Sequence, residues 1–314
     1  MPKQNNLALT LEQRQAVRSD LHNRFEEQHP HYVSEGDAVQ LPPAKKPASL
    51  ANVDISKKQM AQVPIPEPQK SVICGSILGD SSISIDSGYA NARVANRHST
   101  RQFDWFFWKW LVCLKDFING LGTVQVQNPD GYQAKTPLLP GETFLGKLRV
   151  VSKACPQLTA LRVVVCDNAG KKSIERNWLN HMTDYFLMTL WCDDGSLMHR
   201  NQGVISLEST PSPQLEILRD YLRKVWGVET RLERSQQSAK SPVLGYRLAF
   251  VNQDNLLKFL RIVAPIIPVK SMLNKVLFVP TNNPDLLQRW ATELEGLVLP
   301  QFREDVRKFY LSLN

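Results

Sequence analysis

The chain has 314 residues, which is enough for two domains or for one large duplicated domain in which each half buries its own apolar core. Its hydrophobic fraction of 42% is ordinary for a globular protein, and no apolar run reaches the roughly 18 residues that a membrane span requires, so no membrane partner is expected. The net charge of +8 and the pI near 9.2 suit a protein that binds nucleic acid, although basic proteins with other roles are common.

The five cysteines are odd in number and contain no CxxC pair, which argues against a zinc ribbon and against a disulfide framework. A reducing compartment, either the bacterial cytoplasm or an organelle interior, is therefore the simpler expectation. The sequence also contains no GxxxxGK[ST] phosphate loop and no HExxH zinc motif, so the enzyme classes built on those motifs are excluded.

Residues 1–70 differ in composition from the rest of the chain. They contain eight of the 20 prolines and no tryptophan, so they cannot build a core of their own. Within them, Thr10 and Gln13 form a capping-box pattern, and apolar residues at four-residue spacing predict one amphipathic helix over about residues 10–27 that packs against the rest of the chain. The stretch from residue 29 to residue 68 has the composition of a linker.

Two later segments, 114 residues apart, resemble each other. They cover residues 73–83 and 188–197, and in each an apolar helix ends in an acidic residue, Asp80 or Asp194, followed by small residues and the start of a strand. Two such copies predict a duplicated unit.

The residues that follow each copy also match in kind, because strands with alternating polar and apolar positions flank a helix. After the first copy we expect strands at 82–85, 148–151 and 161–165 and an aromatic-rich helix at 102–117, and after the second copy strands at 203–208, 230–234 and 246–251 and a helix at 214–225. The aromatic residues of the first helix have the spacing of core residues rather than of a base-stacking surface. The pattern predicts an α+β fold with an N-terminal extension (1–70), two repeats (71–182 and 183–280) and a C-terminal helical tail (281–314).

The first motif helix has Gly75 and Gly79 four residues apart, so one of its faces carries no side chains and a second helix can approach closely. If the two motif helices pack in parallel, Asp80 and Asp194 emerge at the same end. Two adjacent carboxylates repel each other and favour divalent cations, which can activate water for phosphodiester hydrolysis. The alternative is that each acid only accepts hydrogen bonds from nearby turn amides, which two matched copies make less attractive.

These residues resemble the paired motifs of LAGLIDADG homing endonucleases, in the branch that carries both motifs in one chain. Gly75 and Asp80 match the glycine and the catalytic acid of the first motif, and Asp194 and Gly195 match the closing pair of the second. The similarity extends over about residues 72–280. The chain departs from the usual pattern at Ser81, which replaces a glycine, at Leu78 and Cys192, where a second acid often lies, and at Thr189, which replaces a small residue on the helix interface.

The resemblance implies a pseudo-twofold pair of αββαββα units with two central motif helices and two curved antiparallel DNA-binding sheets. It implies two or three Mg²⁺ or Mn²⁺ ions at the helix-pair interface, held by Asp80 and Asp194 with Gly79 and Asp193 as further ligands. One catalytic lysine per half is also implied, and position after each motif indicates Lys172 and Lys275. Lys171 and Lys270 are the neighbouring alternatives.

The implied reaction is metal-dependent cleavage of both strands of a double-stranded DNA target of roughly twenty base pairs by a monomer, leaving 3′ overhangs. Strand periodicity places polar side chains on the sheet faces that would contact base edges and phosphates. The DNA-contacting candidates are Tyr89, Asn91, Arg93, Arg97, Gln125, Gln127 and Arg149 in the first half and Arg231, Glu233 and Arg247 in the second.

Two other functions fit the same fold. An intron maturase would bind its host intron RNA and assist splicing, and a regulator would bind DNA without cutting it. The presence of both aspartates favours cleavage over either alternative.

Overall fold

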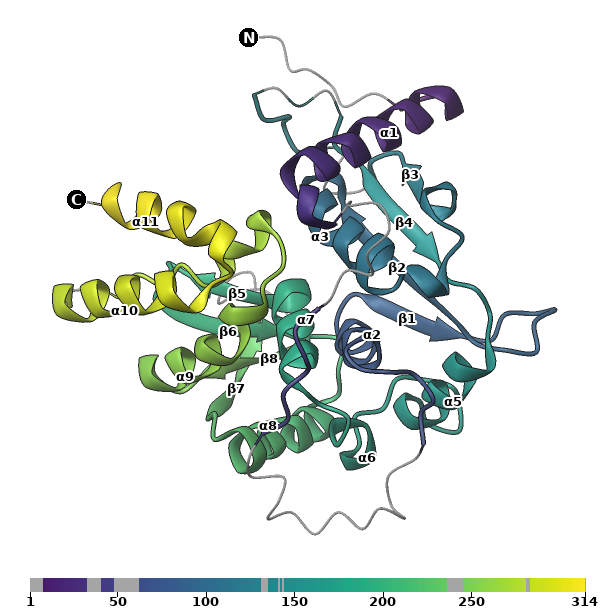
Figure 1. Cartoon of the computed structure of the whole chain (residues 1–314). Helices are drawn as coiled ribbons and strands as arrows, with labels where there is room; N and C mark the ends of the chain where they lie inside the picture. Colours follow the sequence, from purple (N-terminus) through teal and green to yellow (C-terminus); the bar gives the residue numbers. More distant parts are fainter. Residues whose placement is uncertain are drawn as a thin grey trace. The chain divides into compact units, whose positions relative to one another are not determined.

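The fold is α+β, as the sequence pattern predicted. The computed structural model describes residues 8–32, 41–47, 62–130, 135–140, 142, 144–235, 245–280 and 283–313. It divides the chain into two compact units (Figure 1). Unit 1 combines Met1–Leu41 with Asp80–Thr159, and unit 2 combines Pro42–Gly79 with Ala160–Asn314. Each unit contains a four-stranded antiparallel sheet.

The sheet of unit 1 has the strand order β1-β2-β4-β3. Its strands are β1 (Ser81–Ser84), β2 (Arg93–Ser99), β3 (Gln125–Gln127) and β4 (Lys147–Val151). Side chains alternate along β2, so Val94, Asn96 and His98 are buried while the residues between them lie on the other face.

The predicted alternation of strand residues does not extend upstream of β2. A turn at residues 87–88, where Gly88 has a φ of 89°, prevents a strand from forming there. Tyr89 and Asn91 therefore lie in the loop before β2 and not on a strand.

Helix α1 (Leu11–Gln28) confirms the helix that was predicted in the N-terminal extension. Thr10 caps it, and the reciprocal contact between Thr10 and Gln13 forms the expected capping box. The helix packs against β3 and α3 in unit 1, and its Leu21 and Phe25 are buried (Figure 1). The short helix η1 (Pro30–Tyr32) follows it.

The aromatic-rich segment expected at 102–117 is helical, but it changes type along its length. It consists of η3 (Thr100–Gln102), α3 (Phe103–Phe107), the π-helix η4 (Trp108–Cys113) and η5 (Lys115–Phe117), and η6 (Leu121–Thr123) follows. All residues from 103 to 110 are buried, which confirms the expected core packing. Six consecutive buried residues at 105–110 do not fit one face of a regular α-helix, and the wider π-turn accommodates the excess.

The sheet of unit 2 repeats the order of the first sheet, as β5-β6-β8-β7. Its strands are β5 (Gly195–Met198), β6 (Gln202–Ser206), β7 (Thr230–Ser235) and β8 (Gly245–Phe250). Helix α8 (Ser212–Trp226) separates the two strand pairs and ends at Gly227, whose left-handed conformation suits glycine. Helix α9 (Gln253–Val263) follows β8, and its N-terminus is capped by the Asn252 side chain.

Residues 156–165 form helix α5 (Pro156–Val165), so the strand expected at 161–165 is wrong. The run of valines has a high strand propensity, but the burial pattern has a helical period, because Leu158, Leu161 and Val165 are fully buried while Val163 is 75% exposed. Tertiary packing of one helical face decides the conformation here.

The remaining helices of unit 2 are α2 (Gln69–Leu78), α6 (Arg176–Leu179), α7 (Asp184–Asp194), α10 (Pro284–Leu297), α11 (Arg303–Leu311) and the short 3₁₀ segments η7 (Ala264–Ile266), η8 (Lys270–Lys275) and η9 (Pro300–Phe302). Helices α10 and α11 pack against each other (Figure 1). They also bond to the segment after η8, since Trp290 Nε1 donates to the Val276 carbonyl and the Tyr310 hydroxyl to the Phe278 carbonyl. Among the described helices, none is both long and apolar enough to cross a membrane.

Candidate active site

The two motif helices, α2 and α7, pack directly against each other within unit 2. A methyl group placed on Gly75 would lie 2.5 Å from the carbonyl oxygen of Phe186 and 3.0 Å from Cβ of Thr189. The backbone of α2 therefore contacts α7 at a point where only glycine fits. Thr189, one of the residues that depart from the family pattern, lies at this contact.

A second close approach lies one turn further along both helices. A methyl group on Gly79 would lie 2.6 Å from Oδ2 of Asp194 and 3.0 Å from Cβ of Asp193. Since the contacts advance in the same direction along α2 and α7, the helices run parallel and end together. The Ser76 hydroxyl donates to Oδ2 of Asp193 at 3.1 Å, which fixes that carboxylate beside α2.

The shared end of α2 and α7 is strongly electronegative for two reasons. The carboxylates of Asp193 and Asp194 lie there, and the C-termini of both helices add the negative ends of two helix dipoles. Such an arrangement favours cations close to it.

A lysine contacts the end of each motif helix. Nζ of Lys172 donates to the carbonyl oxygens of Ile77 and Gly79, at 2.9 and 3.3 Å, at the end of α2. Nζ of Lys275 donates to the carbonyl of Gly195, at 2.7 Å, directly after α7. The two lysines therefore hold matching positions, one at the C-terminal end of each motif helix.

Local structure explains how the two lysines reach these positions. The chain turns at Gly170, which has a φ of 77°, and Lys172 then pairs with Cys166 in an antiparallel bridge. Lys275 ends η8, and its carbonyl accepts a hydrogen bond from Trp191 Nε1 of α7 at 2.9 Å. The indole of the second motif thus anchors the segment that carries the second lysine.

The neighbouring lysines occupy different surroundings. Nζ of Lys270 forms an ion pair with Asp305 of α11 at 2.5 Å, and Lys171 bonds through its backbone amide to the Asp167 side chain within a surface turn. Their contacts distinguish these two lysines from Lys172 and Lys275. Position in the sequence alone could not make this distinction.

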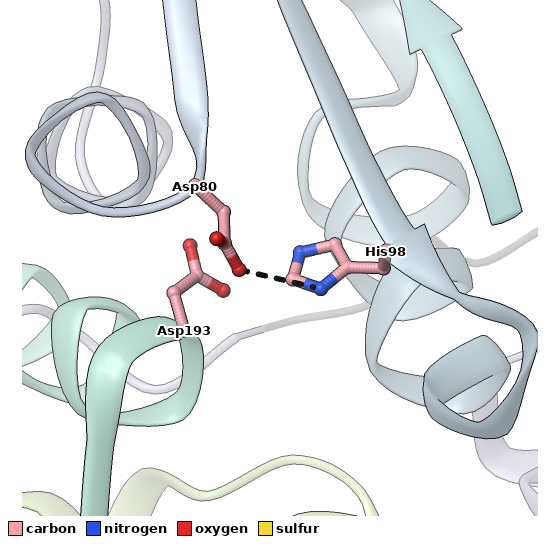
Figure 2. A group of neighbouring side chains, drawn as sticks. All are labelled: Asp80, His98 and Asp193. Carbon is pink, nitrogen blue, oxygen red and sulfur yellow. Dashed lines mark ion pairs between the residues drawn. The ribbon is translucent and has the colours of Figure 1, made fainter. Parts of the chain in front are cut away.

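Asp80 directly follows Gly79 in the chain and is the first residue of unit 1 in that part of the sequence. Within unit 1 its Oδ2 lies 3.6 Å from Nδ1 of His98, whose ring points toward it from β2 (Figure 2). Nδ1 of His98 also lies 3.2 Å from Oε1 of Gln102, and Nε2 lies 3.1 Å from Nζ of the buried Lys109. Asp193, also drawn in Figure 2, is the α7 residue described above.

Sequence reasoning did not assign a role to His98, Gln102 or Lys109. The available signal was the period of β2, which places residue 98 on the core face together with positions 94 and 96. A histidine at the buried end of that strand, eighteen positions after the motif acid, could have been noted as a candidate on that basis.

The outward face of the unit 1 sheet carries a row of cations. Arg97 of β2 is directly opposite Arg149 of β4, which is in turn opposite Gln125 of β3 and donates to its Oε1 at 3.3 Å. Like charges directly opposite each other destabilise a sheet, so this row suits binding of a polyanion better than it suits folding. Gln127 lies on the same side of β3, opposite Lys147.

Arg93, at the start of β2, has local partners. It forms an ion pair with Asp86, and its guanidinium lies 4.6 Å from the ring centroid of Tyr89. Hydrogen bonds from Ser84 and Arg93 hold the pKa of Asp86 below its usual range. Asn91 accepts a hydrogen bond from the Thr159 hydroxyl through its Oδ1.

The corresponding face of the unit 2 sheet is arranged around a carboxylate. Glu233 of β7 forms ion pairs with Arg247 of β8 and with Arg231 two residues earlier on its own strand. One guanidinium nitrogen of Arg231 also donates to the carbonyls of Phe250 and Val251, at 3.3 Å each. These arginines are therefore held in fixed orientations by a carboxylate and by main-chain carbonyls.

The sequence matches a known family over both motif helices and both sheets. A model of the LAGLIDADG DNA endonuclease family matches residues 70–255, more than half of the chain. The chain therefore belongs to the LAGLIDADG DNA endonuclease family, as the motif residues indicated.

A solved structure shows the same fold. The structure described as the homing endonuclease I-WcaI bound to its DNA recognition sequence superposes with a TM-score of 0.55 and 15% sequence identity, covering 74% of this chain and 98% of that one. At this level of identity the likeness shows a shared fold.

Among curated proteins, the chain is similar to several that are named Protein RecA. The protein of Mycolicibacterium fallax is 29% identical over 214 residues, which is 63% of this chain and 44% of that protein. The protein of Mycolicibacterium chitae is 26% identical over 257 residues, which is 77% of this chain and 51% of that protein. The chain spans about half the length of the curated relatives it matches.

Proposed function

We propose that this protein is a homing endonuclease that uses divalent cations, Mg²⁺ or Mn²⁺, to hydrolyse one phosphodiester bond in each strand of a long, specific DNA duplex. The observation that supports this most is the shared end of α2 and α7, where Asp193 and Asp194 lie beside Gly79. Asp80 is the next residue after Gly79, and consecutive Cα atoms are only about 3.8 Å apart. Covalent continuity therefore favours a common acidic site for Asp80 and Asp194.

The donor atoms at this helix end fit a hard divalent cation. They are carboxylate and main-chain carbonyl oxygens, which Mg²⁺ and Mn²⁺ prefer, and the missing side chain of Gly79 lets the Asp194 carboxylate lie close to the backbone of α2. Asp80 and Asp194 would hold the ions, with the carbonyl of Gly79 and the carboxylate of Asp193 as further ligands. A bound divalent cation would polarise the scissile phosphate and lower the pKa of a water molecule.

The two lysines would act on the phosphate side of the reaction. The carbonyl contacts of Lys172 and Lys275 hold each ammonium group at the end of a motif helix, where it can offset charge that develops on a phosphate oxygen. Because each ammonium group is already held in place, it can act on the phosphate without a preceding rearrangement.

The two sheets would bind the DNA. Arg97 and Arg149 would contact phosphates, and the oriented arginines around Glu233 are suited to base edges, since a fixed guanidinium can bind guanine with two hydrogen bonds. The homing endonuclease I-WcaI, which shares the fold, was solved bound to its DNA recognition sequence, and this supports a DNA partner for this chain. We further propose that the protein acts as a monomer and leaves 3′ overhangs, as the family resemblance implies.

The test starts from duplex DNA with a long randomised region. Sequences that the full chain retains are selected, amplified and then incubated with the protein and Mg²⁺, with Ca²⁺ and with EDTA in parallel. We expect a single selected sequence family that is bound in all three conditions and cut in both strands only with Mg²⁺.

Two outcomes would overturn the proposal. Selective binding with no cleavage in Mg²⁺ or Mn²⁺ would indicate a protein that only binds DNA, and cleavage that persists in EDTA would exclude the metal-dependent reaction. Absence of any selected duplex, combined with retention of structured RNA from a matched RNA library, would instead support a maturase.

A further inference from the structure

A lysine lies in the core of unit 1, next to the histidine that faces Asp80. Lys109 is fully buried within the π-helix η4, and its Nζ lies 4.8 Å from the ring centroid of Trp105. An aromatic face attracts an ammonium group. The π-turn adds a residue to the helix and is the kind of local irregularity that often accompanies a functional side chain.

The contact between Lys109 and His98 fixes which ring nitrogen carries the proton. Nζ of Lys109 lies 3.1 Å from Nε2 of His98, and an ammonium group can only donate hydrogen bonds. Nε2 must therefore accept, which leaves the proton of the neutral ring on Nδ1. The surroundings of Nδ1 agree, because the acceptors Oε1 of Gln102 and Oδ2 of Asp80 lie 3.2 and 3.6 Å away.

We infer that Lys109 and His98 are positioning residues for Asp80. The buried lysine selects the His98 tautomer whose Nδ1–H faces both Gln102 Oε1 and the Asp80 carboxylate, and the attraction between this N–H and Oδ2, 3.6 Å from Nδ1, orients the carboxylate for cation binding. The inference rests on the proposed function only where it assigns Asp80 to the cation.

The physical benefit lies in orientation and charge. A carboxylate that is free to rotate presents its lone pairs in many directions, whereas one oxygen held beside an N–H leaves the other directed elsewhere. A neutral ring provides this without placing a second positive charge at the carboxylate, which would compete with a metal ion. Removal of such an indirect partner commonly lowers metal affinity by roughly 10- to 100-fold.

The tautomer is measured directly on the full-length protein by two-bond ¹H–¹⁵N correlation spectra of the histidine rings, with His98 assigned from a His98→Ala spectrum. We expect the wild-type ring to be protonated at Nδ1 and the Lys109→Met ring to lose that preference. In parallel, Mn²⁺ affinity is measured without DNA by electron paramagnetic resonance of the free ion, and we expect roughly tenfold weaker binding for Lys109→Met.

Two further variants separate positioning from folding. Trp110→Phe removes a neighbouring buried hydrogen bond, the one from Nε1 to Asn96 Oδ1, and should change neither the tautomer nor the Mn²⁺ affinity. His98→Asn retains a donor close to the position of Nδ1 and should keep Mn²⁺ affinity within a few-fold of wild type, whereas His98→Ala should not. If Lys109→Met does not fold, the comparison of His98→Asn with His98→Ala still tests whether His98 positions Asp80.

The inference would be overturned by a wild-type His98 ring protonated at Nε2, or by equal Mn²⁺ affinities for His98→Ala and His98→Asn. Neither readout requires cleavage. If the tautomer and the affinities are as expected but Asp80→Asn still cuts DNA, the error lies in the catalytic role proposed for Asp80 and not in the positioning of its carboxylate.

Discussion

At the scale of single residues, the two lysines at the helix ends are the clearest test of the proposed chemistry. Lys172→Met and Lys275→Met remove a cation that the main chain holds in place, so we expect the catalytic rate constant to fall on the order of 100- to 1000-fold with little change in KM. Single-turnover cleavage of the selected duplex measures this.

The chain supplies matched controls for these two variants. Lys171→Met and Lys270→Met change the same residue type one and five positions away, where Lys171 belongs to a surface turn and Lys270 pairs with Asp305, and should leave the rate within a few-fold of wild type. A large loss in either control, with Lys172 and Lys275 dispensable, would reverse the assignment of the lysines.

A second residue-scale prediction concerns His181, a buried histidine between α6 and α7. Its backbone carbonyl accepts from the Ser71 hydroxyl of α2, and burial, reinforced by Lys70, lowers its pKa to about 4. The unfolded chain binds the proton near pH 6.5 and the folded chain only near pH 4, so this residue's contribution to stability is complete above pH 6.5 and is lost as the pH falls toward 4.

We therefore expect the free energy of unfolding to decrease by at most about 3 kcal/mol from this residue between pH 6.5 and pH 4. His181→Phe should remove that part of the pH dependence, whereas His199→Asn, at an exposed histidine, should not. Chemical denaturation at a series of pH values measures it, and an unchanged slope in His181→Phe would contradict the expectation.

At the scale of elements, the parallel packing of α2 on α7 depends on glycine. A methyl group at position 75 would lie 2.5 Å from a backbone oxygen, which cannot move away as a flexible side chain can, so Gly75→Ala should destabilise the protein by about 1–3 kcal/mol. The control is Gly296→Ala in α10, where the added methyl meets nothing within 4 Å and should stabilise by up to about 1 kcal/mol. Equal denaturation midpoints for both variants would show that the helices do not approach as described.

The sheet faces make a separate prediction about salt. If Arg97 and Arg149 contact phosphates, Arg97→Ala and Arg149→Ala should each weaken DNA binding and reduce the slope of log K against log salt by about one. Arg219→Ala, on the exposed side of α8 where Arg219 pairs with Glu216, should leave the slope unchanged. Binding isotherms at several salt concentrations would refute the assignment if the first two variants behaved like the third.

The elements that the sequence predicted well are those whose packing is periodic and local. The capping box of α1 and the alternation of β1 each specify their element without reference to the rest of the fold. Prediction was wrong at α5, where a valine run has strand propensity but a helical face is buried. It also missed the π-helix, because the excess residue is accommodated by tertiary packing of consecutive aromatic side chains.

At the scale of the whole molecule, duplication is the feature that the sequence predicted most completely. Both sheets have the same strand order, and an acidic motif helix precedes each of them in the chain. The acids and glycines of the site follow from that repeat, because their spacing within a helix fixes which face and which end they occupy. The Lys109–His98–Gln102 contacts could not be predicted in the same way, since they join a strand to a helix through side-chain geometry that has no sequence period.

The most direct test of the central claim, that Asp80 and Asp194 serve one acidic site that cuts both DNA strands, is linearisation of a supercoiled plasmid carrying the selected duplex. We predict that the wild-type protein and the exposed-site control Asp116→Asn linearise the plasmid in Mg²⁺, while Asp80→Asn and Asp194→Asn retain the DNA in a gel-shift assay without linearising it. Linearisation by either of the latter two variants at the wild-type rate would contradict the account.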